Sequence, residues 1–290
     1  MSIRRMTTRR LVATYFCIAY GISWGGFVLV VGPGGFPGTG DQFDSLVPTV
    51  AAAMLAGPSV AGLLLTGLVS GRAGLRELLC RLVSWRVGAR WYAIALLPAP
   101  LLSAGVLFAL SLTAPIFTAT DKTTILLAGI AAGLTTVLEE VGWTGFAVPR
   151  LRRQHGVFVT GLIVGVLWGT WHLLQGLWIS RTYSGALPLA FYIPLSFFGA
   201  VAQLTAYRVL MVWVYDHTGS LFVSTVMHAS LTASTVFIFS PDATGAAFLI
   251  YGWTLAAALW VMVAAVAVNG GLAAGPATSK NRFTAGEMAR

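Results

Sequence analysis

Charged residues are scarce in this chain: Asp, Glu, Lys and Arg together make up 9% of its residues. Soluble domains contain about 25%, and 57% of this chain is hydrophobic. These values exclude a soluble module and indicate one polytopic helical membrane domain. Acidic residues are the rarest, with nine against eighteen basic ones and a net charge of +9. Because the basic residues lie in short segments between apolar runs, we expect no nucleic-acid partner.

The chain also lacks the features of a disulfide-linked secreted protein. It has two cysteines, Cys17 in an apolar run and Cys80 in a basic loop, so no disulfide is expected. The first apolar run is too long for a signal peptide, and no small-residue cleavage site follows it. We therefore expect an uncleaved first helix.

Long apolar runs, in contrast, fill most of the sequence. A membrane-spanning helix needs roughly 20 apolar residues, and eight segments approximately meet this length. They are residues 11–32, 46–69, 91–115, 123–148, 157–179, 187–215, 220–239 and 246–268. The predicted fold class is all-α, a bundle of about eight transmembrane helices in a single domain, residues 1–268. The tail, residues 269–290, is rich in Gly, Ala, Ser and Thr and is predicted to be disordered.

The basic residues are distributed unequally between the two sides of this predicted bundle. Eight spans place both termini on one side, and that side receives sixteen of the eighteen basic residues. Lys122 and Arg181 lie on the other side. This asymmetry predicts a plasma-membrane protein with both termini in the cytoplasm. The sixteen are Arg4, Arg5, Arg9, Arg10, Arg72, Arg76, Arg81, Arg86, Arg90, Arg150, Arg152, Arg153, Arg208, Lys280, Arg282 and Arg290.

The inner loop of residues 71–90 differs from the other connections. Its apolar residues recur at helical spacing with arginines between them, namely Leu75, Leu78, Leu79, Leu82 and Val83. This pattern predicts an amphipathic helix lying on the inner leaflet, with membrane lipids as its partner. A lid that guides substrate is the alternative interpretation.

Ionisable residues inside the apolar runs suggest a function. Glu139 and Glu140 are adjacent near the end of one run, and His172 and His228 lie within two later runs. A charged group in a bilayer costs a few kcal/mol or more, and such groups tend to pair with one another. We therefore predict that these four residues form one site.

Two chemistries suit these residue types. Glu139, His172 and His228 are candidate ligands for a zinc ion with an open position for water. Without a metal, a desolvated Glu could act as general base while a His polarises water or a carbonyl. Adjacent helical residues lie about 100° apart, so one Glu should face the site and the other should contact a second group. A proton or ion transporter is a further alternative, but the chain has neither an inverted repeat nor matching interrupted helices.

At these residues the sequence resembles the CAAX-protease and bacteriocin-processing family of intramembrane proteases, also called the Abi family. The family's EExxxR motif corresponds to residues 139–144 (EEVGWT). Its WxxxH and HxxxN motifs correspond to residues 168–172 (WGTWH) and 228–232 (HASLT). The resemblance covers about residues 72–236, with a catalytic core at about 120–240.

The resemblance implies an endopeptidase that hydrolyses a membrane-associated, hydrophobic or lipidated peptide. Glu139 and His172 would activate water, His228 would stabilise the transition state, and Glu140 would orient or balance the site. The family is commonly described as metal-dependent, which implies zinc as a possible cofactor. The candidate substrate-binding residues are Trp143, Trp168, Thr144 and Thr232.

Two positions depart from the family's pattern. Thr144 stands where relatives have Arg, and Thr232 where they have Asn. Thr cannot supply a positive charge beside the Glu pair, and losing one oxyanion donor can cost about 10²–10³ in rate. Arg150 is a candidate replacement cation or, alternatively, an interfacial anchor. The departures keep open a catalytically impaired protein that acts as a membrane scaffold or as an immunity or partner-binding protein.

Overall fold

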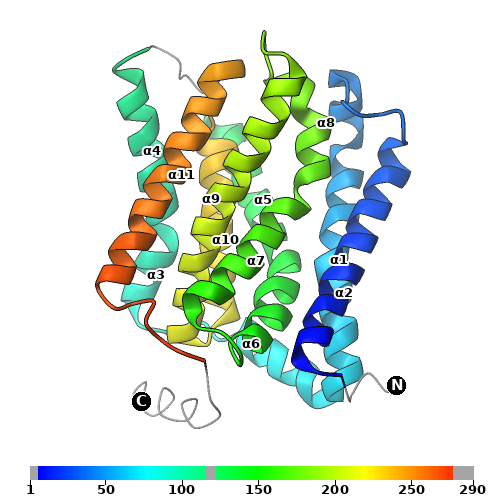
Figure 1. Ribbon diagram of the computed structural model, residues 1–290, viewed down its shortest axis with the longest axis vertical. Helices are drawn as coiled ribbons and strands as arrows, with labels where there is room; N and C mark the ends of the chain where they lie inside the picture. Colours follow the sequence, from blue (N-terminus) through cyan, green and yellow to red (C-terminus); the bar gives the residue numbers. More distant parts are fainter. Residues whose placement is uncertain (1–5, 115–121, 277–290) are drawn as a thin grey trace.

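The computed structural model describes residues 6–114 and 122–276, which form helices joined by short connections, with no strand among them (Figure 1). The helices are α1 (Thr8–Val31), α2 (Gly40–Leu82), α3 (Ala89–Leu96), α4 (Pro98–Ser111), α5 (Lys122–Gly142), η2 (Trp143–Ala147), α6 (Val148–Leu151), α7 (Val157–Trp171), α8 (Leu173–Tyr183), α9 (Leu189–Thr218), α10 (Leu221–Thr232), η3 (Ala233–Ile238) and α11 (Gly245–Val268). Of these, η2 and η3 are π-helical. The predicted all-α bundle is therefore confirmed.

Six helical segments in the described part of the chain are long and apolar enough to cross a membrane. The count becomes seven if α7 and α8, which are bent by 53°, form one span. Helix α5, which carries the Glu pair, is not among them. Each of the eight predicted apolar segments coincides with a helix or a series of helices. The first residues of α1 and the last residues of α11 lie at the same end of the bundle (Figure 1).

The predicted amphipathic segment is helical, but it forms the last part of α2, which ends at Leu82, rather than a separate helix. Gly71, with φ of 60°, interrupts the regular helix where the predicted segment begins. Leu78 is buried, whereas Leu79 and Val83 are 57% and 59% exposed. The apolar residues of this segment therefore divide between packing on the bundle and an exposed face.

Helices α7 and α9 pack closely because glycines line the contacting face of α7. Gly161 and Gly165 are four residues apart and so share that face. A Cβ atom added to either would lie 2.6 Å from a backbone Cα of α9, that of Val209 or of Thr205. Small residues at such spacing let membrane helices approach closely. This contact brings Trp168 of α7 beside Arg208 of α9.

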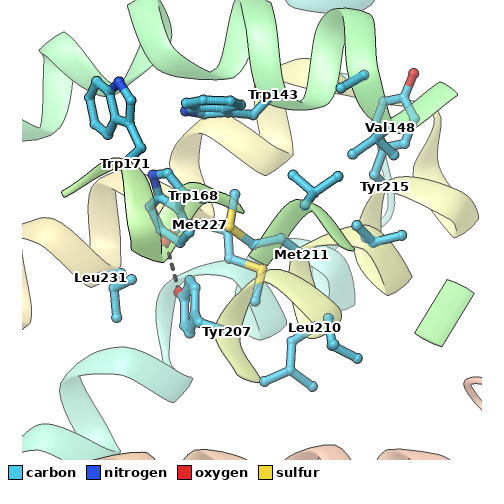
Figure 2. Packing of buried hydrophobic residues seen from close by; sticks show 14 of the residues in the cluster. Trp143, Val148, Trp168, Trp171, Tyr207, Leu210, Met211, Tyr215, Met227 and Leu231 are labelled. Carbon is cyan, nitrogen blue, oxygen red and sulfur yellow. Dashed lines mark hydrogen bonds between the residues drawn. The ribbon is translucent and has the colours of Figure 1, made fainter. Parts of the chain in front are cut away.

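A tight turn joins α9 to α10. Gly219, with φ of 62°, ends α9, and the Ser220 side chain accepts a hydrogen bond of 3.1 Å from the Val223 amide at the start of α10. Within the core, the Tyr207 hydroxyl donates to the Met227 carbonyl at 2.8 Å (Figure 2). These contacts fix His228 of α10 relative to α9.

The beginning of the tail lies near the start of α7. The Val157 amide donates to the Ala274 carbonyl at 3.3 Å. Residues 277–290 are outside the described residues, so the disorder of the tail stays a prediction.

Candidate active site

The Glu140 carboxylate lies at the centre of a buried ion-pair cluster. Its Oε2 accepts a hydrogen bond of 2.9 Å from Arg208 Nη1, and Arg208 Nη2 lies 2.9 Å from its Oε1. Oε1 is also 2.9 Å from His228 Nδ1, and the Thr144 hydroxyl donates to Oε2. Glu140 and Arg208 are both 0% exposed. Because burying a lone carboxylate is costly, this set of partners is what allows Glu140 to be charged inside the bundle.

Arg208 is the site residue that sequence reasoning missed. The distribution of basic residues predicts it on the cytoplasmic side, but its guanidinium lies 4.1 Å from the centre of the Trp168 ring, and its Nη1 donates to the Thr144 hydroxyl at 3.3 Å. A count of basic residues treats every Arg as a surface charge. The available signal was its position within an apolar run, where a charged residue usually has a partner.

Arg150, the candidate replacement cation, contacts its own helical segment. Its Nη1 donates to the Phe146 carbonyl at 2.9 Å, and its guanidinium lies 3.6 Å from the Phe146 ring centre. The cation beside Glu140 is therefore Arg208 rather than Arg150.

Glu139 has different partners from Glu140, as expected for adjacent helical residues. Its Oε2 accepts hydrogen bonds from the indole nitrogens of Trp168 at 2.8 Å and Trp143 at 3.3 Å. Glu139 is 7% exposed. The π-helix η2 begins three residues after Glu140 and carries Trp143 and Thr144. Short π-helical segments are frequent at functional sites, and this one presents both side chains to the Glu pair.

His172 lies at the break between α7 and α8, with φ of −77° and ψ of 0°. Its Nδ1 is 2.9 Å from the Trp168 carbonyl. Because a carbonyl can only accept, Nδ1 carries the hydrogen, and Nε2 of the neutral ring is an acceptor. His172 is half-buried, and its ring makes T-shaped contacts with the rings of Trp168 and Trp171.

Trp168 connects the four predicted site residues. Its indole binds Glu139, and its ring centre lies 4.8 Å from that of His228 and 5.8 Å from that of His172. His228 in turn contacts Glu140.

Trp143, Trp168 and Trp171 lie close together in the core (Figure 2). The structure thus gathers residues from α5, α7 and α10, which lie far apart in the sequence.

The candidate substrate-binding residues differ in their accessibility. Trp143 and Trp168 are 0% and 1% exposed, and both bind Glu139. Thr144 is also buried, whereas Thr232 is half-buried at the end of α10, one helical turn after His228. Contacts of these residues with a substrate stay predictions.

The predicted zinc ligands do not form a metal-binding group in this arrangement. Within residues 6–114 and 122–276, no three His, Cys, Asp or Glu side chains are placed to share a metal ion. Oε2 of Glu139 is occupied by the two indoles, and Glu140 is paired with Arg208. Zinc binding stays a prediction.

Fold and site together define a multi-pass helical membrane protein with a buried glutamate, histidine and arginine cluster. Residues 120–234 match the model of the Rce1-like family, described as type II CAAX prenyl endopeptidase Rce1-like. The matched segment contains Glu139, Glu140, His172 and His228, and it confirms the resemblance to the CAAX-protease family seen in the motifs. No curated protein matches the chain.

Proposed function

We propose that this protein is an intramembrane endopeptidase that hydrolyses a membrane-associated peptide with a hydrophobic or lipid-modified segment. The observation that carries the proposal is the convergence of Glu139, His172 and His228 around Trp168 in the bundle interior. The match to a family named for CAAX prenyl endopeptidases supports a prenylated peptide as the substrate class. We further propose the plasma membrane as its location, with both termini in the cytoplasm.

In the proposed reaction, Glu139 is the general base. A water molecule held between Glu139 and Nε2 of His172 attacks the peptide carbonyl, and its proton passes to Glu139. The two indole donors hold the Glu139 carboxylate in one orientation. Collapse of the tetrahedral intermediate breaks the C–N bond, and the departing amine takes the proton from Glu139.

His228 is the proposed partner of the oxyanion. Because its Nδ1 hydrogen is directed at the Glu140 carboxylate, Nε2 can donate to the oxyanion when the ring is doubly protonated. Two carboxylates would then face one guanidinium and one imidazolium, and the formal charges cancel. A charge-balanced site is what a dry membrane interior favours.

The test uses the purified full chain in proteoliposomes with a fluorescent peptide that ends in a prenylated CAAX sequence. Mass spectrometry of the products would locate the cleaved bond, and the unprenylated peptide is the matched substrate control. We expect wild-type cleavage and its loss in the Glu139→Gln and His172→Gln variants. Cleavage that persists in both folded variants would reject the proposed roles.

A partner-binding scaffold is the second candidate, and Thr232 is the residue that favours it. Its hydroxyl replaces only partly the amide donor that the family has at this position. A folded wild-type protein that cleaves neither peptide, but gains cleavage in the Thr232→Asn variant, would support the scaffold. Cleavage by the wild type would exclude it.

A further inference from the structure

Arg208 has no role in the water-activation step, yet it is completely buried and its charged end is directed at Glu140. The guanidinium donates one hydrogen bond of 2.9 Å from Nη1 to Oε2, and its Nη2 lies at an ion-pair distance of 2.9 Å from Oε1. A charge-assisted hydrogen bond to one oxygen and an ion pair with the other stabilise the ionised form of the carboxylate and restrict its orientation. The Trp168 ring under the guanidinium and the Thr144 hydroxyl beside it hold Arg208 in place.

The same Glu140 oxygen that faces Nη2 of Arg208 also faces Nδ1 of His228. An ionised carboxylate can only accept hydrogen bonds, so it requires a hydrogen on Nδ1. A protonated carboxyl group could donate instead, and it would then no longer determine which ring nitrogen carries the hydrogen. The charge state of Glu140 therefore determines the state of His228.

We infer that Arg208 is a positioning residue that keeps Glu140 ionised and fixed, so that Glu140 holds His228 in its reactive orientation. This inference rests on the proposed function for the role of His228, but the contacts themselves do not. The charge comes from α9, a helix 68 residues further along the chain, and reaches the buried space beside Thr144. Thr144 is one helical turn after Glu140, so a cation could also reach Glu140 from position 144.

A reciprocal exchange of residues is the sharpest functional test. In the Arg208→Gln variant, we expect kcat for the prenylated peptide to fall at least about 10²-fold, as for other residues that orient a catalytic His, with KM nearly unchanged. In the double variant Thr144→Arg/Arg208→Thr, the cation approaches Glu140 from α5, and we expect most of kcat to return. A double variant that folds but stays as impaired as Arg208→Gln would overturn the inference.

The matched control is Arg152→Gln. Arg152 is also buried, at 4% exposure, and pairs with Asp216 at 2.8 Å in another part of the bundle. A general effect of losing a buried arginine should appear in this variant too. We expect its kcat to stay within about threefold of the wild type, because its partner does not contact the Glu and His residues of the site.

A spectroscopic readout separates this inference from the proposed function, since it needs no substrate. A buried carboxylate that loses its cation takes up a proton. We expect the infrared band of a protonated carboxyl group to appear in proteoliposomes of Arg208→Gln, and to be absent from Arg208→Gln/Glu140→Gln and from the exchanged double variant. Absence of this band from folded Arg208→Gln would overturn the inference even if the wild type cleaves peptide. If the wild type cleaves nothing, the band still decides the role of Arg208.

The folding of a second variant tests the inference if Arg208→Gln itself is too unstable to assay. If Arg208→Gln does not fold, Arg208→Gln/Glu140→Gln should fold, because it leaves no unpaired carboxylate. Failure of both would show that Arg208 acts through packing alone and would overturn the inference.

Discussion

At the residue scale, Glu139, Glu140, His172 and His228 could be predicted because ionisable groups in apolar helices are costly and usually have a purpose. Arg208 also lies within an apolar run, but the rule for cytoplasmic charges assigns it to the inner side and so hides it from that reasoning. Only the packing of α9 against α7 shows that its side chain is directed inward. Thr144, read from the sequence as a missing charge, instead binds both members of the ion pair.

This arrangement changes what is expected from restoring the family's Arg at position 144. Thr144 is 2% exposed, and Arg208 already occupies the space beside it. The single variant Thr144→Arg should therefore lose about 1–3 kcal/mol of stability by overpacking and should gain no activity. Thermal unfolding in detergent and peptide cleavage would measure both effects. Faster cleavage than the wild type would show that Arg208 does not supply the required charge.

The Trp168→Phe variant tests the indole donor to Glu139 while it keeps an aromatic ring in place. A hydrogen bond to a charged group contributes about 1.5–3 kcal/mol, so kcat should fall roughly 10- to 100-fold. Trp178→Phe is the control, because Trp178 is also buried and its indole nitrogen has no partner among the described residues. Equal cleavage rates of the two variants would remove Trp168 from the site.

At the element scale, the glycine face of α7 sets how closely α9 approaches. The sequence predicted both helices as apolar runs, but it could not show which faces meet, because every face of an apolar helix is suited to lipid or protein. The bend at His172 and the π-helix after Glu140 were likewise not predictable from apolar length. Both features decide where the side chains of the site are directed.

Gly165→Ala tests this close contact. The added Cβ would lie 2.6 Å from the Thr205 Cα and 3.1 Å from the Arg208 Cβ, so the two helices must separate. We expect a loss of about 1–3 kcal/mol in thermal unfolding and lower cleavage, because Arg208 moves. Gly176→Ala in α8 is the control, since its Cβ meets no atom within 4 Å. If both variants were equally stable, the close α7–α9 contact would be refuted.

At the scale of the whole molecule, the all-helical bundle was predictable from apolar length and charge scarcity alone. The orientation of the bundle in the membrane, in contrast, is predicted only from the distribution of its basic residues. Both cysteines are exposed, Cys80 in the basic segment after Gly71 and Cys17 within the apolar helix α1. These two cysteines therefore allow a direct topology experiment.

If both termini are cytoplasmic, a membrane-impermeant maleimide should label Cys80 in inside-out vesicles and leave it unlabelled in right-side-out vesicles. A Cys80→Ser variant identifies any labelling of Cys17. Labelling of Cys80 in right-side-out vesicles only would reverse the proposed orientation. It would also place the segment after Gly71 on the outer face.

Glu139 is the residue proposed to activate the water that cleaves the peptide. The most direct measurement is the single-turnover rate of prenylated-peptide cleavage by Glu139→Gln in proteoliposomes, with His155→Gln as a control that changes a His in the turn before α7. We predict a loss of at least about 10²-fold for Glu139→Gln, with unchanged peptide binding and a normal rate for His155→Gln. A Glu139→Gln protein that cleaves at the wild-type rate would show that Glu139 is not the general base.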